Sequence, residues 1–177
     1  LVNGTLTRNG SGNRDIVVNC PGTFSVLGAT TNIRNITTDV GGTTVIGANM
    51  SLTGALAIND ALTVGASSVT IGATNITLAS IVGGGNSLTL NGSGVTTLNG
   101  NATGLNNLSS SSTGSFVLAG DISAAGNISI ADALTLSGAG ITRTVAATGN
   151  GTVAFGSTVN GPGSLDVSAG TGAVTFT

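Results

Sequence analysis

Residues 50–78 contain five consecutive short units, and this run restricts the fold more than any other stretch of the chain. Each unit is an apolar residue, a small or polar residue and a second apolar residue. The central residues are Ser51, Ala57, Thr63, Thr70 and Thr77, so successive centres lie six or seven positions apart. Alternation within a unit indicates a strand with one buried face. Turn-forming pairs such as Thr-Gly and Asn-Asp separate the units, so the run predicts short strands and tight turns, not a helix.

The composition favours an all-β fold. Gly accounts for 30 of the 177 residues, and only 6% of the residues are charged, against roughly 25% in an ordinary domain. Lys, Glu and Gln, from which solvated helix surfaces are usually built, do not occur in the chain. Disorder is disfavoured because 40% of the residues are hydrophobic and recur at regular spacing.

Three such units add up to about 18–21 residues, which is the length of one coil in a three-sided parallel β-solenoid. In that fold the outer residues of each unit point inward, the middle residue faces solvent, and coils stack roughly 4.8 Å apart. The alternative is an antiparallel β-sandwich. Two-residue hairpin loops are few and the strands are short, so we expect the β-solenoid.

We expect one solenoid domain, residues 1–177, with three parts that differ in regularity. Residues 1–48 are the least regular. Residues 101–115 are loop-like and include four consecutive serines. Residues 116–177 form a second block of the same units.

One segment is repeated by identity as well as by pattern. Residues 58–64 correspond to residues 130–136 at an offset of 72 positions. The two copies carry Asp60 and Asp132 at equivalent positions, and we expect each carboxylate to cap backbone N–H groups in a turn.

The chain offers few groups for catalysis or cofactor binding. It has no His, Lys or Glu, and the single Cys20 has no His to activate it. We therefore expect no enzyme, no cofactor and no metal site of the His/Cys type. Cys20 is expected to be a small buried residue, with an intermolecular disulfide as the alternative. The six Asp match no Ca²⁺-binding motif.

Nucleic acid and membrane partners are not expected. The net charge of −2 is too small for electrostatic capture of a polyanion, and Tyr and Trp stacking residues are missing. No apolar run reaches the roughly 18 residues that a membrane-spanning helix needs.

Asn-x-Ser/Thr sequons are candidates for N-glycosylation if the protein is exported. Ten occur, and they are headed by Asn3, Asn9, Asn35, Asn49, Asn75, Asn91, Asn101, Asn107, Asn127 and Asn150.

Neither end of the chain has the polar or helical cap that usually covers the exposed strand edges of a solenoid. Val2 and Leu6 at one end, and Val174 and Phe176 at the other, are the residues expected at these edges. We expect copies of the chain to join end to end through them, or the chain to be cut from a longer array.

Several segments resemble the repeats of filamentous-haemagglutinin-like and autotransporter-like bacterial surface proteins. They are NITTDVGGTT (35–44), NMSLTG (49–54), NDALT (59–63) and the tail from Val159 to Phe176. The similarity covers most of residues 35–177, and the chain shows neither the secretion signal nor the anchoring domain of that group. The resemblance implies a secreted or cell-surface β-solenoid with a structural or adhesive role and no shared catalytic residues.

The preferred hypothesis is therefore a structural subunit or repeat of an extracellular bacterial filament or surface adhesin. Its partners would be further copies of itself and host or environmental glycans. The alternative hypothesis is a carbohydrate-binding or carbohydrate-cleaving β-helix. Ice binding through outward Thr rows is a third hypothesis, disfavoured because Thr-x-Thr pairs are sporadic.

Overall fold

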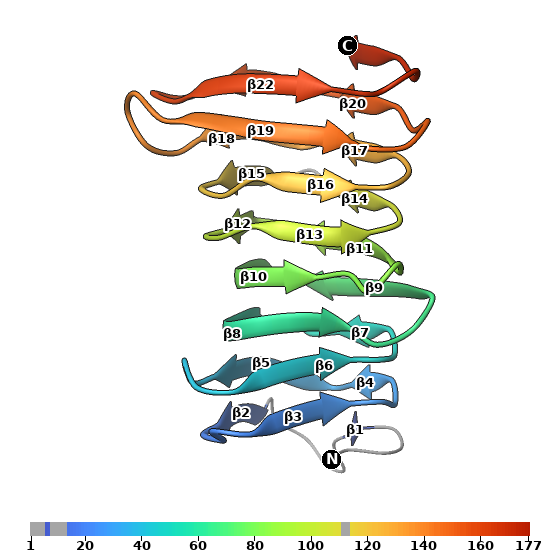
Figure 1. Ribbon diagram of the computed structural model, residues 1–177. Coiled ribbons are helices and arrows are strands. Elements are labelled where there is room, and N and C mark those ends of the chain that lie inside the picture. The colour runs from blue at the N-terminus through green and yellow to red at the C-terminus, as the bar shows by residue number, and fades with distance from the viewer. Residues whose placement is uncertain (1–5, 8–13, 111–113) are drawn as a thin grey trace.

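The structure is a computed structural model and describes residues 6–7, 14–110 and 114–177. Its regular elements are all β-strands, which wind into a β-solenoid of about 8 turns (Figure 1). Strands β1 to β3 lie at one end of the stack, and β22 and β23 at the other. At roughly 4.8 Å per coil the stack rises about 38 Å. The all-β class and the parallel solenoid predicted from the sequence are confirmed.

Each complete coil contributes strand segments to three faces. Face 1 contains β2 (Arg14–Val18), β5 (Ile33–Thr38), the first part of β8 (Ala55–Val64), the first part of β10 (Asn75–Val82), β12 (Val95–Leu98), β15 (Ser115–Leu118), β18 (Ala133–Leu136) and β21 (Val159–Asn160). Face 2 contains β3 (Thr23–Val26), β6 (Thr43–Ile46), the second parts of β8 and β10, β13 (Ala102–Leu105), β16 (Ile122–Ala124), β19 (Thr142–Ala147) and β22 (Ser164–Ser168).

Face 3 contains a 7-stranded sheet of β7 (Met50–Ser51), β9 (Ser68–Ala73), β11 (Ser87–Gly92), β14 (Leu108–Ser110), β17 (Ile128–Ile130), β20 (Val153–Phe155) and β23 (Val174–Phe176). The separate two-stranded sheet of β1 (Leu6–Thr7) and β4 (Thr30–Thr31) extends this face, and the Ser51 N–H of β7 donates to the Thr30 hydroxyl of β4. Faces 1 and 2 form one 14-stranded sheet because β8 and β10 run through the corner between them.

The stacking register is nearly constant in the middle of the chain. Ile76, for example, pairs with Leu56 in the coil before it and with Thr96 in the coil after it. The coil between the partners Phe116 and Leu134 is slightly shorter. The next one, between Leu134 and Val159, is longer because a turn at residues 137–141 extends the chain between β18 and β19 (Figure 1). The predicted coil length therefore holds for most coils, and the C-terminal coils exceed it.

The core is a column of inward side chains, and β8 shows how the sequence creates it. Leu56, Ile58, Leu62 and Val64 are all at most 2% exposed, while the residues between them alternate outward, with the exception of Asp60. The alternation predicted within each unit thus places every second side chain inside the coil.

The Asn-Asp pair predicted as a turn between two units lies inside a continuous strand. Residues 55–64 alternate without interruption, so Asp60 points inward like its apolar neighbours. The pairing of β8 with β10 shifts register at this corner, between the partners Ile58 and Ala61, and then resumes on face 2.

Residues 101–115, predicted as loop-like, contribute to two faces. β13 and β14 lie within this stretch and bury Ala102, Leu105 and Leu108 almost completely. A short solenoid strand needs apolar residues only at its inward positions, so Ser, Asn and Gly between them are compatible with strand structure. The described residues of the less regular N-terminal part, residues 1–48, also follow the stack through β2, β3, β5 and β6.

The internal repeat is a corner motif and not a whole-coil repeat. Residues 58–64 cross from face 1 to face 2, whereas residues 130–136 cross from face 3 to face 1. The offset between the two copies is not a whole number of coils, which explains why they occupy different corners.

Glycine at several corners is required because backbones of successive coils approach closely. A Cβ atom on Gly120 would lie 2.1 Å from the carbonyl oxygen of Gly100, one coil earlier. In contrast, a Cβ on Gly72 within β9 has room. Apart from the residues next to it in the chain, the nearest described heavy atom would be the Met50 carbonyl oxygen at 3.7 Å.

We predict that Gly120→Ala lowers the free energy of unfolding by about 1–3 kcal/mol, since the backbone of the previous coil must shift. Gly72→Ala is the matched control and is expected to be neutral or stabilising by up to about 1 kcal/mol. Urea denaturation followed by circular dichroism measures both. Equal stability of the two variants would contradict the close stacking of corners.

Candidate functional site

Asparagine side chains at the corners connect successive coils. The side-chain oxygen of Asn35 accepts a hydrogen bond from the backbone N–H of Ala55 at 2.7 Å, and Asn75 accepts from Val95 at 2.8 Å. The same contact joins Asn101 to Asp121, Asn107 to Asn127, Asn127 to Thr152 and Asn49 to Thr70. Most of these bonds satisfy backbone donors at or next to the first residue of a strand, whereas Thr70 lies within β9.

This arrangement gives a structural reason for the many sequons. Asn75 sits at the corner, Ile76 is fully buried, and Thr77 faces outward. An Asn, an inward apolar residue and an outward Ser or Thr are what a corner followed by a strand requires. This explanation fits sequons with an apolar middle residue, whereas Asn91 and Asn150 are followed by Gly. N-glycosylation at the sequon asparagines stays a prediction.

The sequon asparagines differ in whether their amide nitrogen, the atom that carries an N-linked glycan, is engaged. Asn35 donates from this nitrogen to Asp15, and Asn107 donates to the Ser87 hydroxyl. Asn150 accepts a hydrogen bond from the Thr171 hydroxyl, and Asn91 is half-buried in β11. Asn3 and Asn9 lie outside the described residues.

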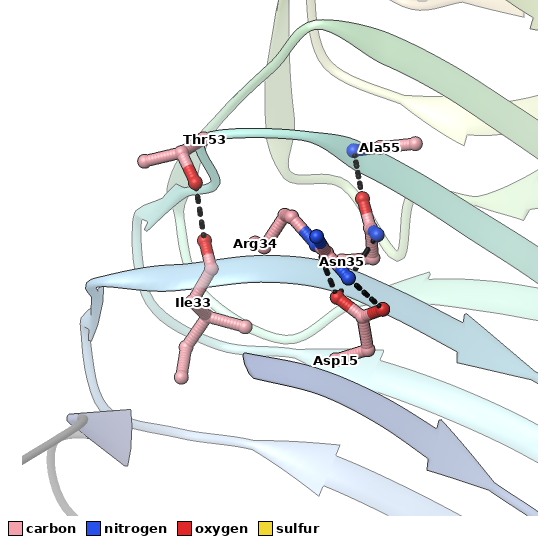
Figure 2. Close-up of polar contacts among 6 residues, drawn as sticks. All are labelled: Asp15, Ile33, Arg34, Asn35, Thr53 and Ala55. Carbon is pink, nitrogen blue, oxygen red and sulfur yellow. Dashed lines mark hydrogen bonds and ion pairs between the residues drawn. The ribbon is translucent and has the colours of Figure 1, made fainter. Parts of the chain in front are cut away.

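Asp15, Arg34 and Asn35 form a polar cluster on the outside of β2 and β5 (Figure 2). Arg34 donates from Nε and Nη2 to the two carboxylate oxygens of Asp15, at 2.7 and 2.5 Å. These hydrogen bonds hold the pKa of Asp15 below its ordinary value and raise the pKa of Arg34. Both side chains are more than a third exposed, so the ion pair adds little to stability. The pair joins side chains of two successive coils, since β2 and β5 are neighbours in the stack.

Asp60 is held inside the core by two hydroxyl groups. Thr44 donates to its carboxylate at 3.1 Å, and Thr38 lies at 3.5 Å, and all three residues are at most 6% exposed. The predicted turn cap is therefore wrong for Asp60, because its inward position directs the carboxylate to side-chain hydroxyls of the previous coil. Asp132, its counterpart in the repeat, is also buried, at 1% exposure.

Two pairs of Asp are separated by about one coil or less in the sequence, Asp121 with Asp132 and Asp39 with Asp60. Asp121 and Asp132 lie at different corners, since one precedes face 2 and the other precedes face 1. Asp39 and Asp60 share a corner in neighbouring coils, yet the described residues contain no group of three His, Cys, Asp or Glu side chains suited to a metal ion. Cys20 is half-buried and carries a free thiol.

The C-terminal coil presents an open edge, defined here as β21, β22 and β23. Among the described residues, each of these strands pairs with the preceding coil alone. Phe176 stacks on Phe155 with ring centroids 4.9 Å apart, but Phe176 is 60% exposed while Phe155 is 1% exposed. Phe155 is buried because Phe176 of the next coil covers it. One further coil stacked on the open edge would cover Phe176 in the same way.

Val174, the other C-terminal residue predicted at an assembly edge, lies in this open edge and is 41% exposed. At the opposite end, Leu6 lies in β1 and pairs with Thr30. Val2 lies outside the described residues.

Comparison with known proteins identifies no relative. No protein-family model, no curated protein and no solved structure matches the chain. Within the described residues there is also no helix long and apolar enough to cross a membrane.

We predict that Thr44→Val lowers the free energy of unfolding by about 1–3 kcal/mol, because the buried Asp60 carboxylate loses a hydrogen-bond donor. Thr77→Val removes a hydroxyl from the outer side of face 1 and serves as control, with an expected change within about 0.5 kcal/mol. Urea denaturation of both variants measures the difference. Equal values would show that the Thr44 hydroxyl does not support Asp60.

Proposed function

We propose that this chain is a structural subunit or repeat of an extracellular bacterial filament or surface adhesin, and that copies join end to end. The observation that carries the proposal is the open edge. Its strands present unpaired backbone groups and a partly exposed apolar core, which is the template that a further parallel coil needs.

The sides of the stack support an extended structural role. From Val40 to Gly120 the only charged residue is Asp60, and this residue is buried. The outer surface of these coils is therefore made of hydroxyl, amide and small apolar groups. Such a surface gives no electrostatic repulsion between neighbouring rods, and it carries no Lys or Arg, the residues after which trypsin-like proteases cleave.

Secretion to the cell surface and an adhesive role follow from the resemblance of residues 35–177 to filamentous-haemagglutinin-like repeats, and they belong to the proposal.

Ice binding gains no support. Along face 1 the outward column containing Thr37, Thr77 and Thr97 is interrupted by Ala57 and Val117.

We predict that the purified chain associates into end-to-end oligomers as its concentration rises. The double variant Val174→Lys with Phe176→Lys is expected to remain monomeric, because inward lysines at the open edge cannot be buried in a joined core. Light scattering coupled to size-exclusion chromatography gives the mass, and negative-stain electron microscopy gives the shape of the particles.

The matched control is Val95→Lys with Val40→Lys. These valines are also exposed, at 41% and 86%, but they lie away from the open edge. The control should associate like the unmodified chain. A chain that stays monomeric at every concentration, or oligomers that survive the edge substitutions, would contradict assembly through this edge.

A further inference from the structure

Face 3 carries a hollow of about 390 Å³ on its outer side. This volume lies in the range of roughly 300–1,000 Å³ that is common for small-molecule sites. The hollow extends over β4, β7, β9 and β11, and it is lined by Ala29, Thr30, Asn49, Met50, Ser51, Thr70, Gly72 and Asn91.

The hollow exists because one outward column lacks a side chain. Ser51, Gly72 and Asn91 are register partners in three successive coils, and Gly72 occupies the middle position. With adjacent strands roughly 4.8 Å apart, the backbones of Ser51 and Asn91 are separated by about 10 Å. Thr70 stands beside the gap in the same strand, so the glycine leaves a recess with polar walls.

Neither a positive φ angle nor a close contact with another backbone requires glycine at position 72. The nearest described atom to a Cβ there, apart from its chain neighbours, would be the Met50 carbonyl oxygen at 3.7 Å, which is an ordinary contact. The other described strand glycines differ, because a Cβ on Gly92 would meet the Thr96 hydroxyl at 2.3 Å and Gly104 has a φ of +66°. Glycine inside a strand is destabilising by about 0.5–1 kcal/mol relative to Ala. A glycine inside a strand often marks a bulge, a tight bend or the close approach of a ligand or another backbone. The pairing of β9 with β7 and β11 shows no register shift at Gly72, so there is no bulge at this position.

The walls of the hollow are held in place by hydrogen bonds. Thr30 is 2% exposed, and its hydroxyl accepts from the Ser51 backbone N–H at 2.9 Å and lies 3.4 Å from the Ser51 carbonyl oxygen. The side-chain oxygen of Asn49 accepts from the Thr70 backbone N–H at 2.9 Å. The strands that carry the lining are therefore fixed before any ligand arrives.

The lining selects the chemistry of the ligand. It contains hydroxyl and amide groups, two small apolar surfaces and no charged side chain, so neither an anion nor a cation would find a counter-charge. A single neutral sugar ring matches the polar groups and the width of the recess. Because no aromatic ring lines the hollow, binding should be weak, with a dissociation constant on the order of 1 mM.

We propose that the hollow over Gly72 binds one neutral, hydroxyl-rich sugar residue on the side of the solenoid. The proposal does not depend on end-to-end assembly, since the hollow lies on face 3 and not at the open edge.

Saturation-transfer NMR tests the proposal with the methyl glycosides of glucose, galactose, mannose and N-acetylglucosamine, each in millimolar excess. We expect transfer from the protein to at least one glycoside. Gly72→Val fills the recess with a residue suited to a strand and should abolish that transfer. Ala57→Val, an outward substitution on face 1, should retain it.

Circular dichroism establishes that each variant is folded. If Gly72→Val does not fold, Ser51→Leu fills the same recess from the neighbouring strand and decides the question. Absence of transfer to all four glycosides, or undiminished transfer in a folded variant with a filled recess, would overturn the proposal. Transfer that persists in the variant Val174→Lys with Phe176→Lys would show that sugar binding does not depend on end-to-end assembly.

Discussion

Hydrogen bonding between parallel coils that stack nearly in register is the interaction on which the rest of this structure depends. Each strand segment pairs with the equivalent segment of the next coil, and the short corners leave no room for a helix or a long excursion in most coils. The ladder aligns inward residues into an apolar column and outward residues into rows. The glycines that allow coils to approach, such as Gly120, and the asparagines that bridge corners, such as Asn75, serve this alignment.

The three-residue alternation made the fold predictable, because an apolar–polar–apolar unit every six or seven residues has few other ways to bury its apolar face. Leu56, Ile58, Leu62 and Val64 are all inside as predicted. The position of Asp60 was not predictable from residue type, since Asn-Asp is usually a turn and only the uninterrupted alternation of β8 carries the carboxylate inward. The strands in residues 101–115 were also not predictable from composition, because Ser, Asn and Gly surround the inward Leu105 and Leu108.

The candidate sites were predictable to different degrees. The inward positions of Val174 and Phe176 could be predicted from the alternation of their unit, and their exposures of 41% and 60% come from the structure. The hollow over Gly72 could not be predicted, since it depends on the register that sets Ser51 and Asn91 on either side of one glycine. A glycine within an alternating strand is a weak signal until its surroundings are known. The two proposals concern different surfaces, the open edge and the hollow on face 3. One chain can therefore both assemble end to end and bind a ligand on its side.

Disulfide trapping tests the parallel stacking most directly, on a background in which Cys20 is replaced by Ser. Thr77 and Thr97 are outward register partners in neighbouring coils, at a separation that suits a disulfide, with Cα atoms about 4.4–6.8 Å apart. Ser80 and Thr89 would instead face each other in an antiparallel hairpin turning at residues 83–86, but here they lie on faces 2 and 3. We predict rapid oxidation of the pair Thr77→Cys with Thr97→Cys and none of the pair Ser80→Cys with Thr89→Cys. The reverse result would contradict the solenoid.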